Sequence, residues 1–166
     1  MAARNYFDIH DVLALEEEVP ITFHHGVFQL AQYVKPTSME GEKQTEVSAG
    51  SNAVVPLWSA VPLRVSGAAM TRVARNYRSF HDFTPDKLAP SMPSRSMYFY
   101  EAGMTLCATL PQHEGLRLRN ELRRLFQKRA IRVIAASKMQ PLDREDVMSR
   151  LSERERCLMQ SALRVR

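Results

Sequence analysis

The first third of the chain alternates hydrophobic and polar residues with the period of two that is typical of β-strands. Residues 19–25, 27–34 and 53–57 each predict one strand. Proline cannot donate a hydrogen bond to a neighbouring strand, so Pro56 ends the last of them or confines it to a sheet edge.

Two segments flank these strands. Residues 6–15 predict a strand that leads into a short helix, with Asp8 or Asp11 available as its N-terminal cap. Residues 35–52 are rich in Pro, Ser, Thr, Gly, Glu and Lys and contain almost no large apolar residue, a composition typical of a mobile loop. We therefore expect residues 1–63 to form a small β-rich domain with a mobile loop at 35–52.

Beyond residue 63 the hydrophobic residues recur at the three- and four-residue steps of amphipathic helices. The predicted helices cover residues 67–80, 84–88, 94–110, 116–137 and 143–162. The segment 94–110 is apolar almost all round and should be buried, and the last helix opens at Asp143 with Asp146 in a capping box. The predicted fold class is α+β, a small β-rich N-terminal domain followed by a mainly α-helical C-terminal domain, a helical bundle, over residues 64–166.

The two ends of the chain carry opposite charge. Residues 1–50 contain three basic and eight acidic residues, a balance of −5, so residues 51–166 contain 20 basic and 10 acidic residues, a balance of +10. The total of +5 permits an anionic partner such as nucleic acid or an acidic protein surface. Net charge alone does not select between these partners.

Two charged residues interrupt the apolar stripes of the last two predicted helices. At 100° per residue, Arg129 falls within the stripe of Leu118, Leu122 and Val133, and Glu155 falls within the stripe of the last helix. A buried charge requires a partner, so we predict that Arg129 and Glu155 form a buried ion pair, with Glu101 as the next carboxylate in line for the arginine. The alternative is that one of them extends to the edge of its stripe and reaches water.

A row of basic residues runs beside the apolar stripe of the 116–137 helix. It consists of Arg117, Arg124, Lys128 and Arg132. This basic stripe is either a solvated or subunit-facing surface, or a surface that follows a phosphate backbone. Aromatic residues are not interleaved with it, so base stacking is not indicated.

The segment 50–63 contains the only tryptophan and separates the two halves. We interpret Pro56, Leu57 and Trp58 as an apolar joint that docks the acidic β-rich half onto the basic helical half. If Trp58 is exposed, it becomes a candidate contact for another subunit.

The sequence gives no support for catalysis or metal binding. His24 and His25 are neighbours on a predicted strand and point to opposite faces, so they cannot chelate one ion together. Phosphate-binding glycine loops and hydrolase motifs are absent, and Cys107 and Cys157 are expected to be reduced. No apolar run approaches the roughly 20 residues of a membrane span. We expect an intracellular protein with no catalytic residues, no cofactor and no metal, and no association with a membrane.

Several segments together resemble one known family. The opening YFDIHDVLALEEEVPITF resembles its aromatic-Asp-Ile-Leu segment with the following strand, and GSNAVVPLWSA resembles its Gly-Ser and Leu-Pro-Leu-Trp signature. YFYEAG at 98–103 resembles its tyrosine-rich helix start, and LFQKRAIRVI with RLSERERCLM resembles its last two helices, with Arg129 and Glu155 at matching places. On these motifs the chain resembles a divergent member of the subunit 3 family of the eukaryotic GINS complex.

The resemblance implies a nuclear protein without catalytic activity of its own. Members of the family join three sister GINS subunits in a heterotetramer, which clamps the MCM ring together with a RecJ-like cofactor in the replicative DNA helicase (the CMG complex) at the replication fork. The expected role is that of a scaffold acting through protein–protein interaction in DNA replication, with DNA as a candidate neighbour. The alternative is a free-standing nucleic-acid-binding module that uses the basic helix 116–137.

Overall fold

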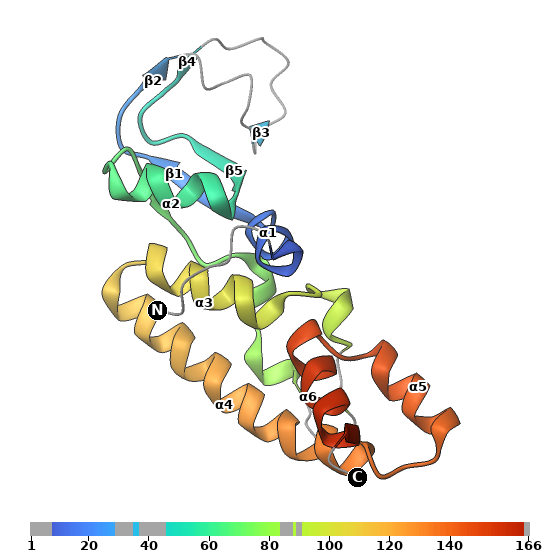
Figure 1. The fold of residues 1–166 in the computed structure, drawn as a ribbon. Helices are drawn as coiled ribbons and strands as arrows, with labels where there is room; N and C mark the ends of the chain where they lie inside the picture. The colour runs from blue at the N-terminus through green and yellow to red at the C-terminus, as the bar shows by residue number, and fades with distance from the viewer. Residues whose placement is uncertain (1–7, 29–34, 37–45, 84–87, 89–90, 165–166) are drawn as a thin grey trace. The chain divides into compact units, whose positions relative to one another are not determined.

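The computed structural model describes residues 8–28, 35–36, 46–83, 88 and 91–164. It confirms the α+β class, with the strands early and most of the helices later in the chain (Figure 1). The chain divides into two compact units. The sheet unit comprises Met1–Ala74 and Thr105–Leu116, and the helical unit comprises Arg75–Met104 and Arg117–Arg166.

The centre of the sheet unit is a four-stranded antiparallel sheet with the strand order β3-β5-β1-β6. Its strands are β3 (Lys35–Pro36), β5 (Asn52–Pro56), β1 (Glu18–Phe23) and β6 (Ala69–Thr71). In this register Ile21 of β1 faces Ala53 of β5 on one side and Thr71 of β6 on the other. A separate two-stranded sheet pairs β2 (Val27–Phe28) with β4 (Glu46–Val47).

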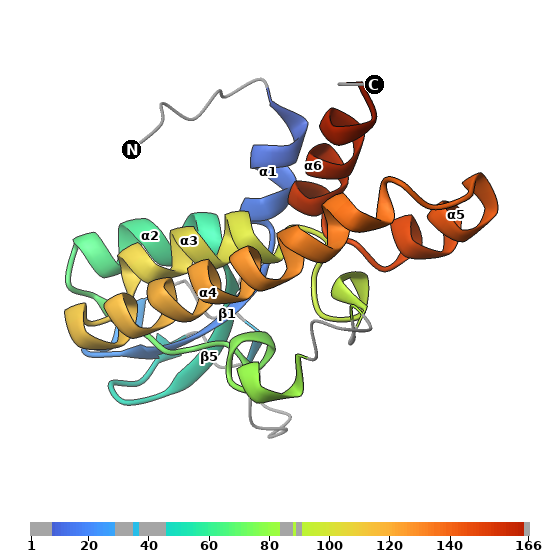
Figure 2. The ribbon, with the colours of Figure 1, turned by 90° about the horizontal axis from the view of Figure 1, so that it is seen from below.

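The alternation that predicts β1 and β5 also determines their burial. Val19, Ile21 and Phe23 are buried on β1, whereas the residues between them are half-buried, and Ala53 and Val55 repeat this on β5. Helix α2 (Leu57–Val65) packs on this sheet through its buried residues Leu57 and Ala60 (Figures 1 and 2). Strand β5 ends at Pro56, as expected of a proline that cannot continue a ladder.

The predicted helix over residues 67–80 is wrong. Helix α2 lies before it, residues 69–71 form β6, and the rest contains the short 3-10 helices η1 (Arg75–Tyr77) and η2 (Phe80–Asp82). Pro62 lies inside α2. Because an interior proline normally ends a helix, the sequence does not indicate a helix over these residues. The sheet therefore extends past the predicted boundary between residues 63 and 64, since β6 pairs with β1.

The start of the chain agrees with the sequence where it is described. Helix α1 (Ile9–Leu15) is capped by Asp8, whose Oδ1 accepts the amide N–H of His10 at 2.9 Å. The strand predicted before this helix lies mostly outside the described residues. The same holds for the 27–34 strand beyond β2 and for the centre of the 35–52 loop, residues 37–45. The ends of that loop segment contribute β3 and β4.

The helical unit is built mainly from long helices. They are α3 (Phe99–Thr109) and α4 (Gln112–Ala136), which continue into the sheet unit at their adjoining ends, and α5 (Pro141–Ser149) and α6 (Glu153–Arg164), preceded by the 3-10 helix η4 (Met92–Ser94). We expected a single final helix from residue 143. This prediction is wrong, because residues 150–152 are not helical and separate α5 from α6. The helix predicted at 84–88 lies outside the described residues except for Leu88, whose φ of 50° is not helical.

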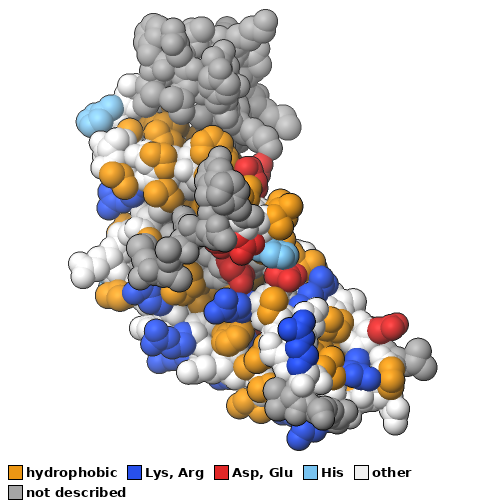
Figure 3. Space-filling model, in the orientation of Figure 1, with side chains coloured by type: hydrophobic (Ala, Val, Ile, Leu, Met, Phe, Trp, Pro, Cys, Tyr) orange, Lys and Arg blue, Asp and Glu red, His pale blue; other side chains and the backbone are white. Residues whose placement is uncertain are grey.

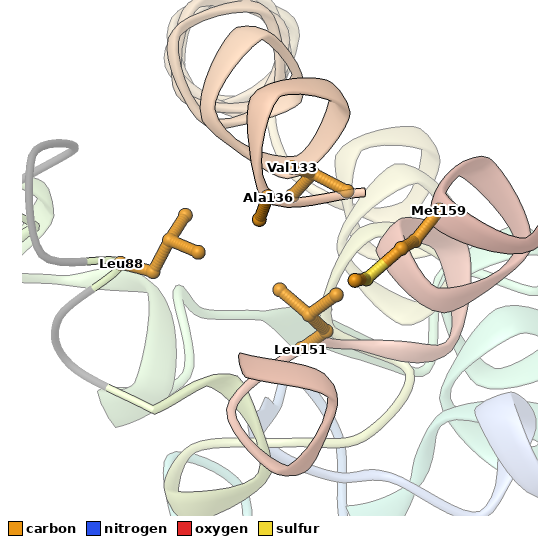
Figure 4. Packing of buried hydrophobic residues seen from close by; sticks show 5 residues of the cluster. All are labelled: Leu88, Val133, Ala136, Leu151 and Met159. Atoms are coloured by element: carbon orange, nitrogen blue, oxygen red, sulfur yellow. The ribbon is translucent and has the colours of Figure 1, made fainter. Parts of the chain in front are cut away.

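Two packing features hold the helical unit together. Figure 4 shows Leu88, Val133, Ala136, Leu151 and Met159 pointing toward one another in a buried cluster between α4, the end of α5 and α6. Where α3 meets α4, a Cβ added at Gly103 would lie 2.8 Å from Leu122 Cδ1 and 2.8 Å from Tyr77 Cε1. This glycine permits the close approach of the two helices.

Candidate functional site

The first turn of α6 forms a capping box. Ser152 precedes the helix, and its Oγ accepts the amide N–H of Glu155 at 3.4 Å, while Oε2 of Glu155 accepts the amide N–H of Ser152 at 3.1 Å. A serine followed three residues later by glutamate is the sequence signature of this motif. The predicted capping box at Asp143 and Asp146 was therefore placed at the wrong helix start. The real one holds the carboxylate of Glu155 in a fixed position over the helix end.

Arg129 of α4 binds this same carboxylate with two nitrogen atoms. Its Nε donates to Oε1 of Glu155 at 2.6 Å and its Nη2 donates to Oε2 at 3.1 Å, and both side chains are 0% exposed. The structure thus brings the predicted pair together, and Glu155 rather than Glu101 takes the two bonds. The two-point geometry is the strong form of the arginine–carboxylate interaction.

Tyr100 of α3 completes the cluster. Its hydroxyl donates to Oε1 of Glu155 at 2.9 Å, so this oxygen accepts from Tyr100 and from Arg129. Burial raises the pKa of Tyr100 above its ordinary value, and the adjacent carboxylate of Glu155 raises it further. The phenol therefore remains protonated and acts as a permanent hydrogen-bond donor. We call Tyr100, Arg129, Ser152 and Glu155 the ionic clamp.

Aromatic rings surround the tyrosine. Its ring meets Phe126 at a centroid distance of 5.1 Å and an angle of 81°, and Phe99 at 5.6 Å and 89°. Edge-to-face contacts of this kind are favourable and exclude water. They leave the hydroxyl as the polar tip of an otherwise apolar contact.

The geometry of the ionic clamp is suited to stabilising the packing of helices. Its charged groups are fully buried and face one another, so a substrate has no approach to them in this chain. One nitrogen, Nη1 of Arg129, is buried without a hydrogen-bond partner within the described part of the chain. The clamp joins three helices that are distant in sequence, α3, α4 and α6, through one carboxylate.

The predicted basic stripe lies beside the apolar stripe of α4, about 60–140° around the helix from Arg129. Arg117, Arg124, Lys128 and Arg132 are all exposed and fall within about 80° of one another on the helix. Arg124 has only a distant ion pair, Nη1 to Oε1 of Glu121 at 3.8 Å. The structure therefore brings the four basic residues together on one open helix face.

The residues of the predicted joint, Pro56, Leu57 and Trp58, lie at the end of β5 and the start of α2. Leu57 is fully buried and Pro56 is half-buried, but Trp58 is 54% exposed. The prediction is wrong for Trp58, because the helix that starts at Leu57 carries the next side chain away from the sheet that buries Leu57. Trp58 becomes instead a candidate contact for another subunit.

The sequence reasoning missed the exposed face of α1. Ile9 is 66% exposed, Val12 44% and Leu13 43%. The signal was present in the spacing i, i+3, i+4, which marks the apolar face of a helix. Sequence alone does not show whether such an apolar face turns inward.

Within the described residues, no three His, Cys, Asp or Glu side chains come together in a way that could hold a metal ion. In the same part of the chain no helix has the length and apolar character required to cross a membrane.

A scan against protein-family models and a search of curated proteins both give no match for this chain.

Proposed function

We propose that this chain is a non-catalytic scaffold subunit of the eukaryotic GINS heterotetramer, acting in the nucleus. It joins three sister subunits, and the tetramer holds the MCM ring together with a RecJ-like cofactor in the replicative helicase. The basis is the resemblance of its segments to the subunit 3 family, in the same order along the chain.

The exposure of Trp58 carries this proposal. It belongs to the Pro-Leu-Trp segment, the most specific part of the resemblance, and the chain by itself leaves it 54% exposed. Tryptophan is enriched among the residues that dominate binding energy at protein interfaces, because it combines a large apolar area with little conformational freedom. An exposed tryptophan at the start of a rigid helix is suited to contact a second protein.

Two further observations support the proposal. The α+β fold, with strands early and helices later, agrees with the domain order that the resemblance implies. The residues Arg129 and Glu155, which match the family's last two helices, form the buried clamp. A scaffold subunit requires such internal rigidity, because its interfaces must keep their geometry.

Co-expression with the three sister subunits of the same organism tests this function. We expect a complex with one copy of each chain by native mass spectrometry. A well-behaved monomer that does not bind the sister subunits would contradict the proposal.

A Trp58→Ala variant tests the contact itself. We expect it to weaken assembly about tenfold or more, as alanine variants at interface anchors do. Val65→Ala is the matched control, since Val65 lies on the same helix and is 84% exposed. Equal assembly of both variants would show that Trp58 is not an interface residue.

The second candidate function, nucleic-acid binding by the basic helix 116–137, is favoured by the exposed basic stripe. If the stripe contacts phosphates, the logarithm of the affinity for duplex DNA should fall with the logarithm of salt concentration by roughly 0.9 per phosphate contact. Replacing all four basic residues with alanine should flatten that slope. The pair Arg72→Ala and Arg75→Ala, exposed arginines outside α4, serves as the control.

A further inference from the structure

Helix α1 turns its apolar side away from the protein. Ile9, Val12 and Leu13 are exposed, and Ala14 is its one buried residue. At about 100° per residue, Ile9, Val12 and Leu13 lie within about 100° of one another, whereas Ala14 lies about 140° from Ile9. The helix thus buries a small residue and leaves these three large ones exposed.

This short helix is nevertheless fixed in place. Seven residues form a marginal helix on their own, so α1 depends on its ends. Asp8 caps the start, and just after the helix the carbonyl oxygen of Glu17 accepts the amide N–H of Leu57 at 2.9 Å, at the first residue of α2. This bond also places the exposed Trp58 close to the end of α1. The apolar face is therefore presented in a defined position.

Carboxylates surround the apolar face. From Asp8 to Glu18 the chain has five acidic residues and no lysine or arginine, and Asp8, Glu16 and Glu18 are exposed. Glu16 follows the helix on the side of Ile9, by the same helical arithmetic. Figure 3 shows hydrophobic, acidic and histidine side chains gathered over α1.

The charge selects the chemistry of the partner. Phosphate backbones and anionic lipid surfaces are repelled by this concentration of carboxylates, so neither nucleic acid nor an anionic membrane fits the surface. Residues spaced i, i+3 and i+4 on one helix face are the anchors with which a helix enters an apolar groove of another protein. A groove edged with lysine and arginine would complement the carboxylates and guide association.

We propose that α1 is a docking helix, which inserts Ile9, Val12 and Leu13 into an apolar groove edged with basic residues on another protein. Resting on the proposed function, the partner is one of the sister GINS subunits. The interface continues toward Trp58 at the start of α2.

The first test removes the apolar anchors. A full-length variant with Ile9→Ser, Val12→Ser and Leu13→Ser should keep its far-UV circular dichroism and melting temperature, because the replaced side chains are exposed in this chain. Titrated against the three co-expressed sister subunits, it should bind about tenfold or more weakly than the unmodified chain. Val65→Ser, which removes an 84% exposed apolar side chain from α2, a helix without acidic residues, should bind normally.

The second test locates the basic edge. Carbodiimide, which joins carboxylates to neighbouring amines, should link Glu16 or Glu18 to a lysine of a sister subunit in the assembled complex. Glu16→Lys should weaken assembly. Glu114→Lys, which reverses the charge of an exposed residue at the start of α4, should not.

The outcomes separate this inference from the function on which it rests. A complex that forms equally well with the triple serine variant overturns the docking helix and leaves the proposed function standing. Cross-links that join Glu16 only to a second copy of this chain, seen with isotopically labelled mixtures, overturn the assignment to a sister subunit. Failure of the unmodified chain to join the sister subunits overturns both.

Discussion

The two faces of α4 use arginine in opposite ways. On the inner face, Arg129 is 0% exposed and binds Glu155 through Nε at 2.6 Å and Nη2 at 3.1 Å. On the outer face, Arg124 is 72% exposed, and its Nη1 lies 3.8 Å from Oε1 of Glu121. Arg124 and Arg129 are five residues apart on one helix, yet the charge of Arg129 is buried against a carboxylate and the charge of Arg124 is exposed to solvent.

The difference lies in the surroundings and not in the residue. A buried guanidinium has lost its hydration, so it depends on the few groups that face it, and the loss of one leaves an uncompensated charge. An exposed guanidinium exchanges protein for water at almost no cost. Arg129 therefore stabilises the packing of α4 against α6, whereas the arginines of the basic stripe are exposed on the surface.

Removal of the inner carboxylate should have the largest effect. Glu155→Gln leaves Arg129 buried opposite a neutral amide, and we expect it to lower the free energy of unfolding by about 3–5 kcal/mol, as measured for broken buried pairs. Urea unfolding followed by circular dichroism measures this. The exposed pair of Arg150 and Asp146, whose nitrogen and oxygen are 2.8 Å apart, gives the matched control, since Arg150→Met should cost about 0–1 kcal/mol.

Replacing both partners distinguishes the loss of a charge from the loss of a contact. The double variant Arg129→Met and Glu155→Leu removes both charges and should recover a large part of the stability lost in either single variant. A double variant as unstable as the sum of the two single ones would show that shape, and not uncompensated charge, dominates at this position.

The clamp could be predicted from the sequence because helical periodicity is simple arithmetic. Arg129 and Glu155 interrupt apolar stripes, and a buried charge has few solutions other than an opposite one. The same regularity predicted β1, β5 and α4. Tyr100 could not be assigned to the clamp, because no periodicity relates a residue of α3 to the start of α6.

The predictions that the structure overturns share one physical cause. Tertiary packing overrides the local sequence pattern. An interior proline normally ends a helix, yet α2 continues through Pro62, supported by the contact of Leu57 and Ala60 with the sheet. The segment 67–80 has a helical spacing of apolar residues, but its residues 69–71 pair with β1. The apolar spacing of Ile9, Val12 and Leu13 is visible in the sequence, whereas the exposure of that face of α1 depends on tertiary packing.

The tyrosine of the clamp should give an intermediate effect. Tyr100→Phe removes the hydrogen bond from the hydroxyl to Glu155, and we expect a loss of about 1.5–3 kcal/mol at neutral pH, the range for bonds to charged groups. The ring contacts with Phe99 and Phe126 remain in this variant, so the change isolates the polar tip.

The same variant predicts a pH dependence. The pKa of Tyr100 is raised in the folded chain by burial, so its contribution is complete below the unfolded pKa of about 10 and is lost as the pH rises above it. The advantage of the unmodified chain over Tyr100→Phe should therefore shrink above about pH 10, with a slope of up to about 1.4 kcal/mol per pH unit. An advantage that stays constant to pH 11 would mean that the hydroxyl titrates normally.

Removal of an outer arginine should have the smallest effect, and it tests the comparison most strictly. Arg124→Ala breaks a weak pair three residues apart on the helix, worth about 0.2–0.5 kcal/mol, and alanine favours the helix slightly more than arginine does. The two changes nearly cancel, so urea unfolding should shift by less than about 0.5 kcal/mol at low salt and by less still at high salt, where the pair is screened. Arg117→Ala, which breaks no ion pair among the described residues, should match it. A cost above about 1 kcal/mol that persists in salt would mean that the outer face stabilises the isolated chain. In that case the two faces of α4 would differ only in degree, and the basic stripe would contribute to the fold of the chain itself.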